Sequence, residues 1–158
     1  MDQYTYRQLC GRFATGVVIV TARDGDGAPC GMTANSFASV SLDPPLISIA
    51  VGHEATIHPL LLGTRIFAVS ILESRQESLS RRFASGLPDR FEGVGWHEGP
   101  EGQVLLDGAL AHLHCEKWSE VPAGDHSLFL GRVTGGSAAE HGRPLLFYRS
   151  GYADPDGL

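Results

Sequence analysis

The hydrophobic pattern near the start of the chain changes its period once. Apolar side chains at Tyr6, Leu9, Cys10 and Phe13 recur at the spacing of one helical face. The run 17–21 that follows is β-branched and continuously apolar, which is typical of a strand buried on both faces. We therefore expect an amphipathic helix followed directly by a buried strand.

Short apolar runs bounded by Gly, Pro or Asp dominate the rest of the chain, as in strands joined by turns. They predict strands at residues 30–33, 36–41, 46–51, 67–72, 109–120, 127–135 and 145–149, and short helices near residues 56–62 and 76–84. Residues 85–102 have no clear period, so a long surface excursion is expected there. Many short strands with few helices predict a mainly β fold, a closed or partly closed antiparallel barrel.

Length and charge narrow the classes of protein. A chain of 158 residues fits one domain spanning residues 1–158. The net charge is −6 and no basic run exceeds Arg81-Arg82, which argues against a nucleic-acid partner. No apolar stretch approaches the ~20 residues of a membrane span, and residues 1–15 do not resemble a signal peptide. We therefore expect a cytoplasmic protein that does not cross a membrane.

The spacing of cysteines and histidines does not indicate a metal site. Cys10, Cys30 and Cys115 are odd in number and far apart, which predicts reduced thiols rather than a disulfide framework or a zinc site. His112 and His114 would share one face of a strand, but no third ligand follows at a suitable spacing. We predict that the protein holds no metal.

Familiar phosphate-binding loops are missing from the sequence. Gly25-Asp26-Gly27 begins like GxGxxG, but position 30 is Cys and the segment lies between expected strands. Residues 31–41 instead alternate small hydroxyl or amide side chains with apolar ones. Two interpretations stay open for that segment: the polar side of a strand, or a cradle for a flat, polar-edged ring and a phosphate.

The segment Gly31-Met32-Thr33-Ala34-Asn35-Ser36-Phe37, followed by Ser41-Leu42-Asp43-Pro44-Pro45-Leu46, closely resembles the signature of the short-chain flavin reductase family. Residues 16–22, 67–72, 82–84, 124–133 and 144–152 resemble further stretches of that family in the same order. The family comprises the reductase components of two-component flavin monooxygenases. The resemblance implies an FMN-binding split barrel, in a homodimer with the flavin near the subunit interface. It also implies hydride transfer from NADH, sometimes NADPH, to FMN or FAD, which a partner monooxygenase then receives.

The resemblance also implies a flavin site, in which Asn35 is the foremost candidate. It assigns the following residues to the flavin: Thr33, Ala34, Asn35, Ser36, Ser39, Ala50, Val51, Gly52, Thr56, Arg82 and Phe83. Thr56 would receive the phosphate at a helix start, Arg82 would contact phosphate or pyrophosphate, and Phe83 would form an apolar wall. The alternatives are that Arg82 is a solvated helix residue and Phe83 an ordinary core residue.

On the nicotinamide side, the resemblance places His126 where its imidazole can bind the carboxamide or a phosphate, with Asp125 orienting it. Tyr148, Arg149 and Tyr152 would close the nucleotide pocket, although packing is the alternative for both tyrosines. No side chain is assigned as a catalytic acid or base, because hydride transfer depends on positioning and the two cofactors supply the electronic chemistry.

Two hypotheses follow for the function. The first is an NAD(P)H:flavin oxidoreductase that supplies reduced flavin to a partner monooxygenase. The second is a flavin- or haem-binding split-barrel carrier without reductase turnover. Flavin-dependent oxidation of NADH separates them, because only the first hypothesis predicts it.

Overall fold

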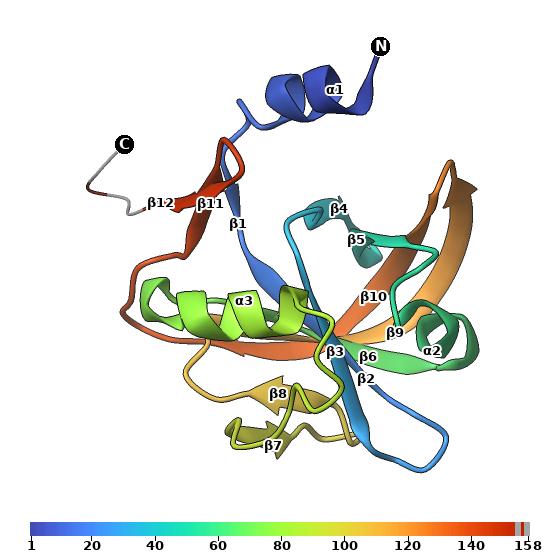
Figure 1. The fold of residues 1–158 in the computed structure, drawn as a ribbon. Coiled ribbons are helices and arrows are strands. Elements are labelled where there is room, and N and C mark those ends of the chain that lie inside the picture. The colour runs from blue at the N-terminus through green and yellow to red at the C-terminus, as the bar shows by residue number, and fades with distance from the viewer. Residues whose placement is uncertain (154–155, 157–158) are drawn as a thin grey trace.

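The computed structural model describes residues 1–153 and 156, and these form twelve strands and three α-helices (Figure 1). The helices are α1 (Gln3–Cys10), α2 (His58–Gly63) and α3 (Glu77–Ala84), with a 3-10 turn at Ser74–Gln76. The strands are β1 (Thr15–Gly16), β2 (Val18–Arg23), β3 (Pro29–Ala34), β4 (Ala38–Leu42), β5 (Pro45–Gly52), β6 (Ile66–Ile71), β7 (Trp96–Glu98), β8 (Val104–Leu106), β9 (Ala111–Ala123), β10 (His126–Ala138), β11 (Leu146–Tyr148) and β12 (Gly151–Ala153).

The main sheet has seven antiparallel strands in the order β3-β2-β6-β9-β10-β5-β4. Strands β1, β11 and β12 form a second small sheet, and β7 pairs with β8. The long sheet curls on itself, since side chains of β2 near one end and of β5 near the other belong to the same core. The prediction of a mainly β antiparallel barrel is therefore confirmed.

Strand β2 separates two hydrophobic cores. Val18 and Val20 point into the barrel, where they pack in one cluster with Ile49 and Phe129. Ile19 points the other way, into a cluster formed with α3, β8 and the chain before β11. The expectation that this β-branched run is buried on both faces is confirmed, because Ile19 and Val20 are both inaccessible to solvent.

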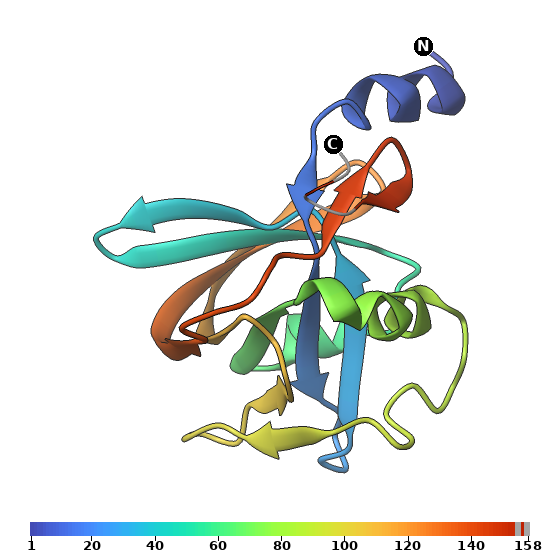
Figure 2. The same cartoon turned by 90° about the vertical axis from the view of Figure 1, so that its left-hand side faces the viewer.

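Helix α1 forms where the sequence predicts it, but it stands away from the barrel (Figures 1 and 2). The Asp2 carboxylate caps it by accepting from the backbone N–H of Thr5 at 2.9 Å. Every residue from Met1 to Cys10 is exposed, and so is Phe13. The helix therefore forms an apolar face that the described part of the chain leaves uncovered.

The expected excursion over residues 85–102 contains strand β7, so that prediction is wrong in part. Arg23 holds the β7-β8 hairpin against β2. Its Nε donates to the carbonyl of Gly102 at 2.8 Å, its Nη2 contacts the Glu98 carboxylate at 2.5 Å, and its guanidinium lies 5.2 Å from the Trp96 ring. Long-range contacts, those of Arg23 among them, thus stabilise a hairpin that the local pattern does not reveal.

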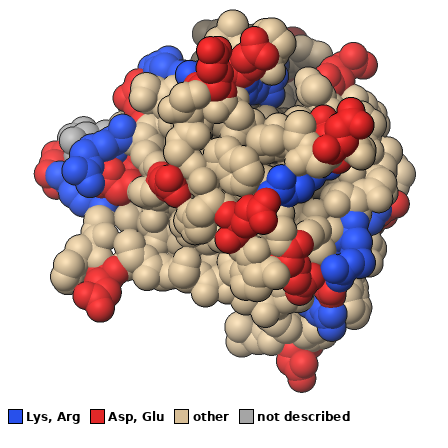
Figure 3. Space-filling model, turned by 90° about the horizontal axis from the view of Figure 1, so that it is seen from below, with Lys and Arg blue, Asp and Glu red and all other residues tan. Residues whose placement is uncertain are grey.

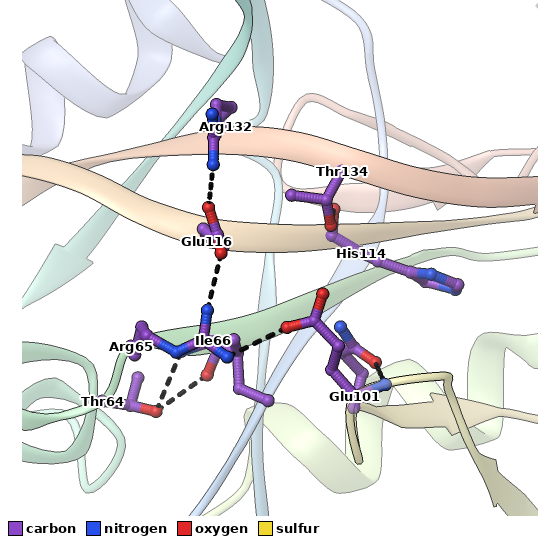
Figure 4. A network of polar contacts seen from close by, with 9 residues as sticks. Thr64, Arg65, Ile66, Glu101, His114, Glu116, Arg132 and Thr134 are labelled. Atoms are coloured by element: carbon purple, nitrogen blue, oxygen red, sulfur yellow. Dashed lines mark hydrogen bonds and ion pairs between the residues drawn. The ribbon is translucent and has the colours of Figure 1, made fainter.

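Charged side chains form a network across β6, β9 and β10 (Figure 4). The Glu116 carboxylate lies between Arg132 and Arg65, and Arg65 also reaches Glu101 at 3.0 Å. Lys and Arg are interspersed with Asp and Glu on the face shown in Figure 3. Of the helices in residues 1–153 and 156, none is long and apolar enough to span a membrane.

Candidate functional site

Strand β3 carries the first flavin candidates along one edge of the main sheet. The Thr33 hydroxyl donates to the carbonyl of Ser80 on α3 at 2.6 Å, so it is engaged in packing the helix on the strand. Ala34 is buried, whereas the side chain of Asn35 is exposed directly after the strand ends. Asn35 therefore has the amide donor and acceptor that this strand can offer to a ligand.

The flavin-motif loop is held to the end of β5 by one side chain. The Ser36 hydroxyl donates to the carbonyl of Ala50 at 3.0 Å and accepts from its N–H at 3.1 Å. Val51 is fully buried, so only its backbone can approach a ligand, and Ser39 is exposed on β4. Residues that are far apart in sequence thus lie at one place, as the flavin assignment requires.

The end of β5 also meets the histidine that was expected on the nicotinamide side. His126 pairs directly with Gly52 across β10 and β5, and a Cβ on Gly52 would lie 3.6 Å from the imidazole Nε2. The His126 Nδ1 lies 2.6 Å from the Asp125 carboxylate, and this hydrogen bond lowers the pKa of Asp125. The carboxylate fixes Nδ1 as the donor, so Nε2 of the neutral ring is an acceptor.

A cavity of about 170 Å³ opens at the Asn35 end of β3. Thr33, Ala34 and Asn35 form one wall, and Phe147 and Tyr152 of the C-terminal hairpin form another. The Tyr152 hydroxyl lies 2.6 Å from that of Ser80, and the Arg81 guanidinium lies over its ring at 4.7 Å. Tyr152 is therefore brought to the flavin motif, with its hydroxyl already bonded to α3.

A larger cavity of about 840 Å³ lies along the other end of β3. Cys30 and Gly31 of the strand, Thr56, and the loop 86–92 line it. Helix α2 begins at His58, after an N-cap at Ile57, so Thr56 lies just before the helix rather than in its first turn. Thr56 and the flavin-motif strand nevertheless share one cavity.

Arg82 and Phe83 serve this cavity indirectly. Two carbonyls of the lining loop, of Asp89 and Glu92, accept from Arg82 Nη2 at 2.9 Å and 2.7 Å, and its Nε is buried without a partner in the described chain. Phe83 is fully buried, and a Cβ on Gly31 would lie 2.8 Å from its ring. In this structure Arg82 therefore orders the loop, and the Phe83 ring has no surface open to a ligand.

Tyr148 and Arg149 lie at the turn between β11 and β12. The Arg149 guanidinium lies 5.3 Å from the Tyr148 ring. The backbone N–H of Arg149 donates to the carbonyl of Gly11 at 2.9 Å. Arg149 and Ser150 adopt φ values of 50° and 62°, which non-glycine residues rarely do. Among the described residues, no hydrogen bond or ring contact joins this turn to His126.

Sequence reasoning missed two residues that organise the site. Ser80 is fully buried and bonds both walls of the smaller cavity, through Thr33 and Tyr152. Arg90 donates from Nη1 to the carbonyl of Gly31 at 3.0 Å, and so ties the cavity loop to β3. A small polar residue on the buried side of a helix was the available signal for Ser80. No metal-binding cluster of three His, Cys, Asp or Glu occurs in residues 1–153 and 156.

The fold and the site together define a split-barrel protein with two cavities along its edge strand β3. The chain belongs to the flavin reductase like domain family, whose model matches residues 10–156. Because the matched range includes β3, β5, α3 and β10, the resemblance found in the sequence is confirmed.

Relatives with stated activities cover nearly the whole chain. The reductase subunit HsaB of a flavin-dependent monooxygenase from Rhodococcus jostii is 40% identical over 99% of this chain and 80% of its own. An NADH-dependent FAD reductase from Streptomyces globisporus is 47% identical over 84% of this chain and 74% of its own. The solved structure of the Streptomyces globisporus NADH:FAD oxidoreductase SgcE6 with NAD and FAD fragments superimposes with a TM-score of 0.92, at 42% identity, over 98% of this chain and 94% of that one.

Proposed function

We propose that this protein is an NAD(P)H:flavin oxidoreductase that reduces FMN or FAD with NADH and supplies the reduced flavin to a partner monooxygenase. The observation that carries the proposal is the junction at the end of β5. There Ser36 binds Ala50, two residues before Gly52 lies against His126. The flavin motif and the nicotinamide candidate thereby meet on one strand, and relatives named as flavin reductases and monooxygenase reductase components support the same activity.

Two cavities along β3 offer space and donors to a flavin. The larger one lies within the ~300–1,000 Å³ that ligand pockets usually have. At the smaller one, Asn35 offers an amide donor and acceptor to a polar ring edge. The nicotinamide and the flavin supply the hydride chemistry when both are bound. Asn35 would hold the flavin ring, and Thr56 the phosphate. Tyr152 and Phe147 would exclude water from one side of the ring.

His126 would orient the nicotinamide. While Nδ1 of the neutral ring donates its hydrogen bond to the Asp125 carboxylate, Nε2 is an acceptor and suits the N–H of a carboxamide. Replacing His126 with Ala removes about one hydrogen bond, so we expect the KM for NADH to rise roughly five- to tenfold with flavin affinity unchanged. His141→Ala, on an exposed loop, is the control and leaves both constants unchanged. An equal loss of NADH and flavin affinity in His126→Ala would contradict this role.

We also propose a homodimer. The uncovered face of α1 carries Tyr6 and Leu9, and further exposed apolar side chains lie at Leu42, Trp118 and Val121. An amphipathic helix whose apolar face is not packed against its own chain is typical of an interface with another protein. Light scattering is expected to give twice the mass of one chain, and a monomer at micromolar concentration would refute the assignment.

The carrier hypothesis remains the second candidate, because a flavin cradle by itself does not require turnover. Oxidation of NADH by the purified protein is expected to depend on added FMN or FAD. If flavin binds but NADH is not oxidised above background, the protein is a carrier.

We further propose a single-domain protein located in the cytoplasm. The three free cysteines of the structure support the cytoplasmic location.

A further inference from the structure

The two walls of the smaller cavity come from parts of the fold that share no sheet. One wall, residues 33–35, lies at the end of β3 in the main sheet, whereas Phe147 and Tyr152 belong to the small sheet of β1, β11 and β12. The strands of that small sheet are only two or three residues long, so few backbone hydrogen bonds fix it. The distance between the two walls therefore depends on side-chain contacts.

Ser80 joins these two walls from helix α3. Its hydroxyl lies 2.6 Å from the Tyr152 hydroxyl, and its carbonyl accepts from the Thr33 hydroxyl at 2.6 Å. Ser80 is fully buried, and Phe83, three residues later on the same face of α3, is buried in the cluster that contains Ile19. The Ser80 hydroxyl therefore has no water to bond in place of Tyr152, and it sits on a helix face that is itself packed.

The Tyr152 ring is held on two further sides. The Arg81 guanidinium lies over the ring at 4.7 Å, and the Phe147 ring meets it edge-on with the centroids 5.4 Å apart. Arg81 is in turn paired with Glu77, one turn back on α3, at 2.7 Å. Helix α3 thus sets the orientation in which the Tyr152 ring faces the cavity.

The size of the cavity makes this orientation matter. At about 170 Å³ it lies below the ~300–1,000 Å³ that pockets for whole ligands usually have, so it can take a flat ring and little more. Hydride transfer needs two rings in near-contact stacking, and a displacement of about 1 Å can cost roughly a hundredfold in rate. A small shift of the Tyr152 wall would therefore slow the transfer more than it would weaken the binding of the ring.

We propose that Ser80 is a positioning residue that fixes the flavin ring for hydride transfer by holding Tyr152 and Thr33 at a set distance from each other. This inference rests on the proposed function, since the flavin ring would lie at Asn35 and receive the hydride there. Ser80 is fully buried and does not line the cavity. It acts on the ring only through the two residues that it binds.

Single-turnover reduction separates positioning from binding. Protein saturated with FMN is mixed with saturating NADH in the absence of oxygen, and the oxidised-flavin absorbance is followed. In Ser80→Ala the first-order rate should fall about ten- to a hundredfold. The Kd for FMN and the NADH concentration that gives the half-maximal rate should each change less than about threefold.

Ser70→Ala is the matched control. Ser70 is also fully buried, and its hydroxyl accepts from the backbone N–H of Leu106 at 3.3 Å. Neither Ser70 nor Leu106 lines the smaller cavity. Ser70→Ala should lower the thermal midpoint to an extent similar to Ser80→Ala and leave the rate of flavin reduction unchanged.

Tyr152→Phe removes the other end of the same hydrogen bond. The double variant Ser80→Ala/Tyr152→Phe should be no slower than the slower of the two single variants, because one bond cannot be lost twice. Losses that multiply in the double variant would mean that the two hydroxyls act separately, which would overturn the proposal.

The fluorescence of bound FMN gives a second readout that needs no turnover. An aromatic ring packed against a flavin quenches its emission, so the emission reports how Tyr152 lies against the bound ring. Ser80→Ala should therefore change the fluorescence lifetime of bound FMN, and Ser70→Ala should leave it as in the unchanged protein.

The outcomes distinguish this role from the proposed function. If the unchanged protein reduces FMN and Ser80→Ala does so at the same rate, or loses rate and FMN affinity by equal factors, the role of Ser80 is wrong and the reductase function stands. If the unchanged protein binds FMN but does not oxidise NADH, the reductase function is wrong. The lifetime of bound FMN then decides whether Ser80 still positions the ring, and equal lifetimes in Ser80→Ala and the unchanged protein would overturn that as well.

Discussion

Gly31, the first residue of the flavin motif, is expected to matter through packing rather than through ligand contact. A Cβ at this position would lie 2.8 Å and 3.0 Å from two atoms of the Phe83 ring and 3.3 Å from the carbonyl oxygen of Val20. Phe83 is fully buried between Gly31 and Phe91, so its ring has little room to move. Gly31→Ala should therefore lower the free energy of unfolding by about 1–3 kcal/mol, the usual cost of an overpacked core.

Urea denaturation of a double-mutant cycle measures this effect. Phe83→Leu removes the ring edge that the new methyl group would strike, so the Gly31→Ala/Phe83→Leu variant should be more stable than the two single losses predict, by at least ~0.5 kcal/mol. Gly63→Ala is the control, since a Cβ there meets nothing within 4 Å, and its stability should change little or rise. Additive losses in the cycle, or a Gly31→Ala protein of unchanged stability that binds flavin weakly, would refute the packing argument.

Three further predictions concern stability. Ser150→Gly should raise the free energy of unfolding by about 1 kcal/mol, or the thermal midpoint by ~2–4 °C, because Ser150 sits at a φ of 62° that glycine adopts without strain. The pKa of Glu73 is lowered to about 2 by hydrogen bonds from Arg75 and Ser74, so its stabilising contribution is complete above its unfolded pKa of about 4.3 and is lost as the pH falls towards 2. Glu73→Gln should flatten the stability profile between pH 5 and pH 2 in acid titrations followed by circular dichroism, and an unchanged slope would contradict this. Glu116→Gln should lower the urea midpoint at low salt, because Arg65 and Arg132 then repel each other without the carboxylate between them. The difference from the unchanged protein should narrow at high salt, because salt screens that repulsion.

Local sequence patterns predicted the elements whose own residues carry a clear hydrophobic signal. The β-branched run of β2 is continuously apolar, as in a strand buried on both faces, and the spacing of Leu79 and Phe83 marks the inner face of α3. Strand β7 was missed because it carries one apolar residue, Trp96, and is held by Arg23 from a distant strand. Such a contact leaves no trace in a short window of sequence.

The same distinction holds at the site. The flavin motif was recognisable because its small polar residues are consecutive, and the structure adds that Ser36 binds the backbone of β5. The sequence could show only that Ser80 is a small polar residue on the buried side of a helix, because its partners, Thr33 at its carbonyl and Tyr152 at its hydroxyl, lie 47 and 72 residues away along the chain. The indirect role of Arg82 depends on carbonyls of an irregular loop, which no periodicity can place.

The central claim is that this chain transfers a hydride from NADH to flavin. Anaerobic mixing of the protein with NADH and excess FAD tests it most directly, with the nicotinamide and oxidised-flavin absorbance bands followed together. The account predicts that one flavin is reduced for each NADH oxidised, at a rate proportional to protein concentration and lowered at limiting NADH in His126→Ala. Bound flavin that stays oxidised in the presence of NADH would contradict it and would identify the protein as a carrier.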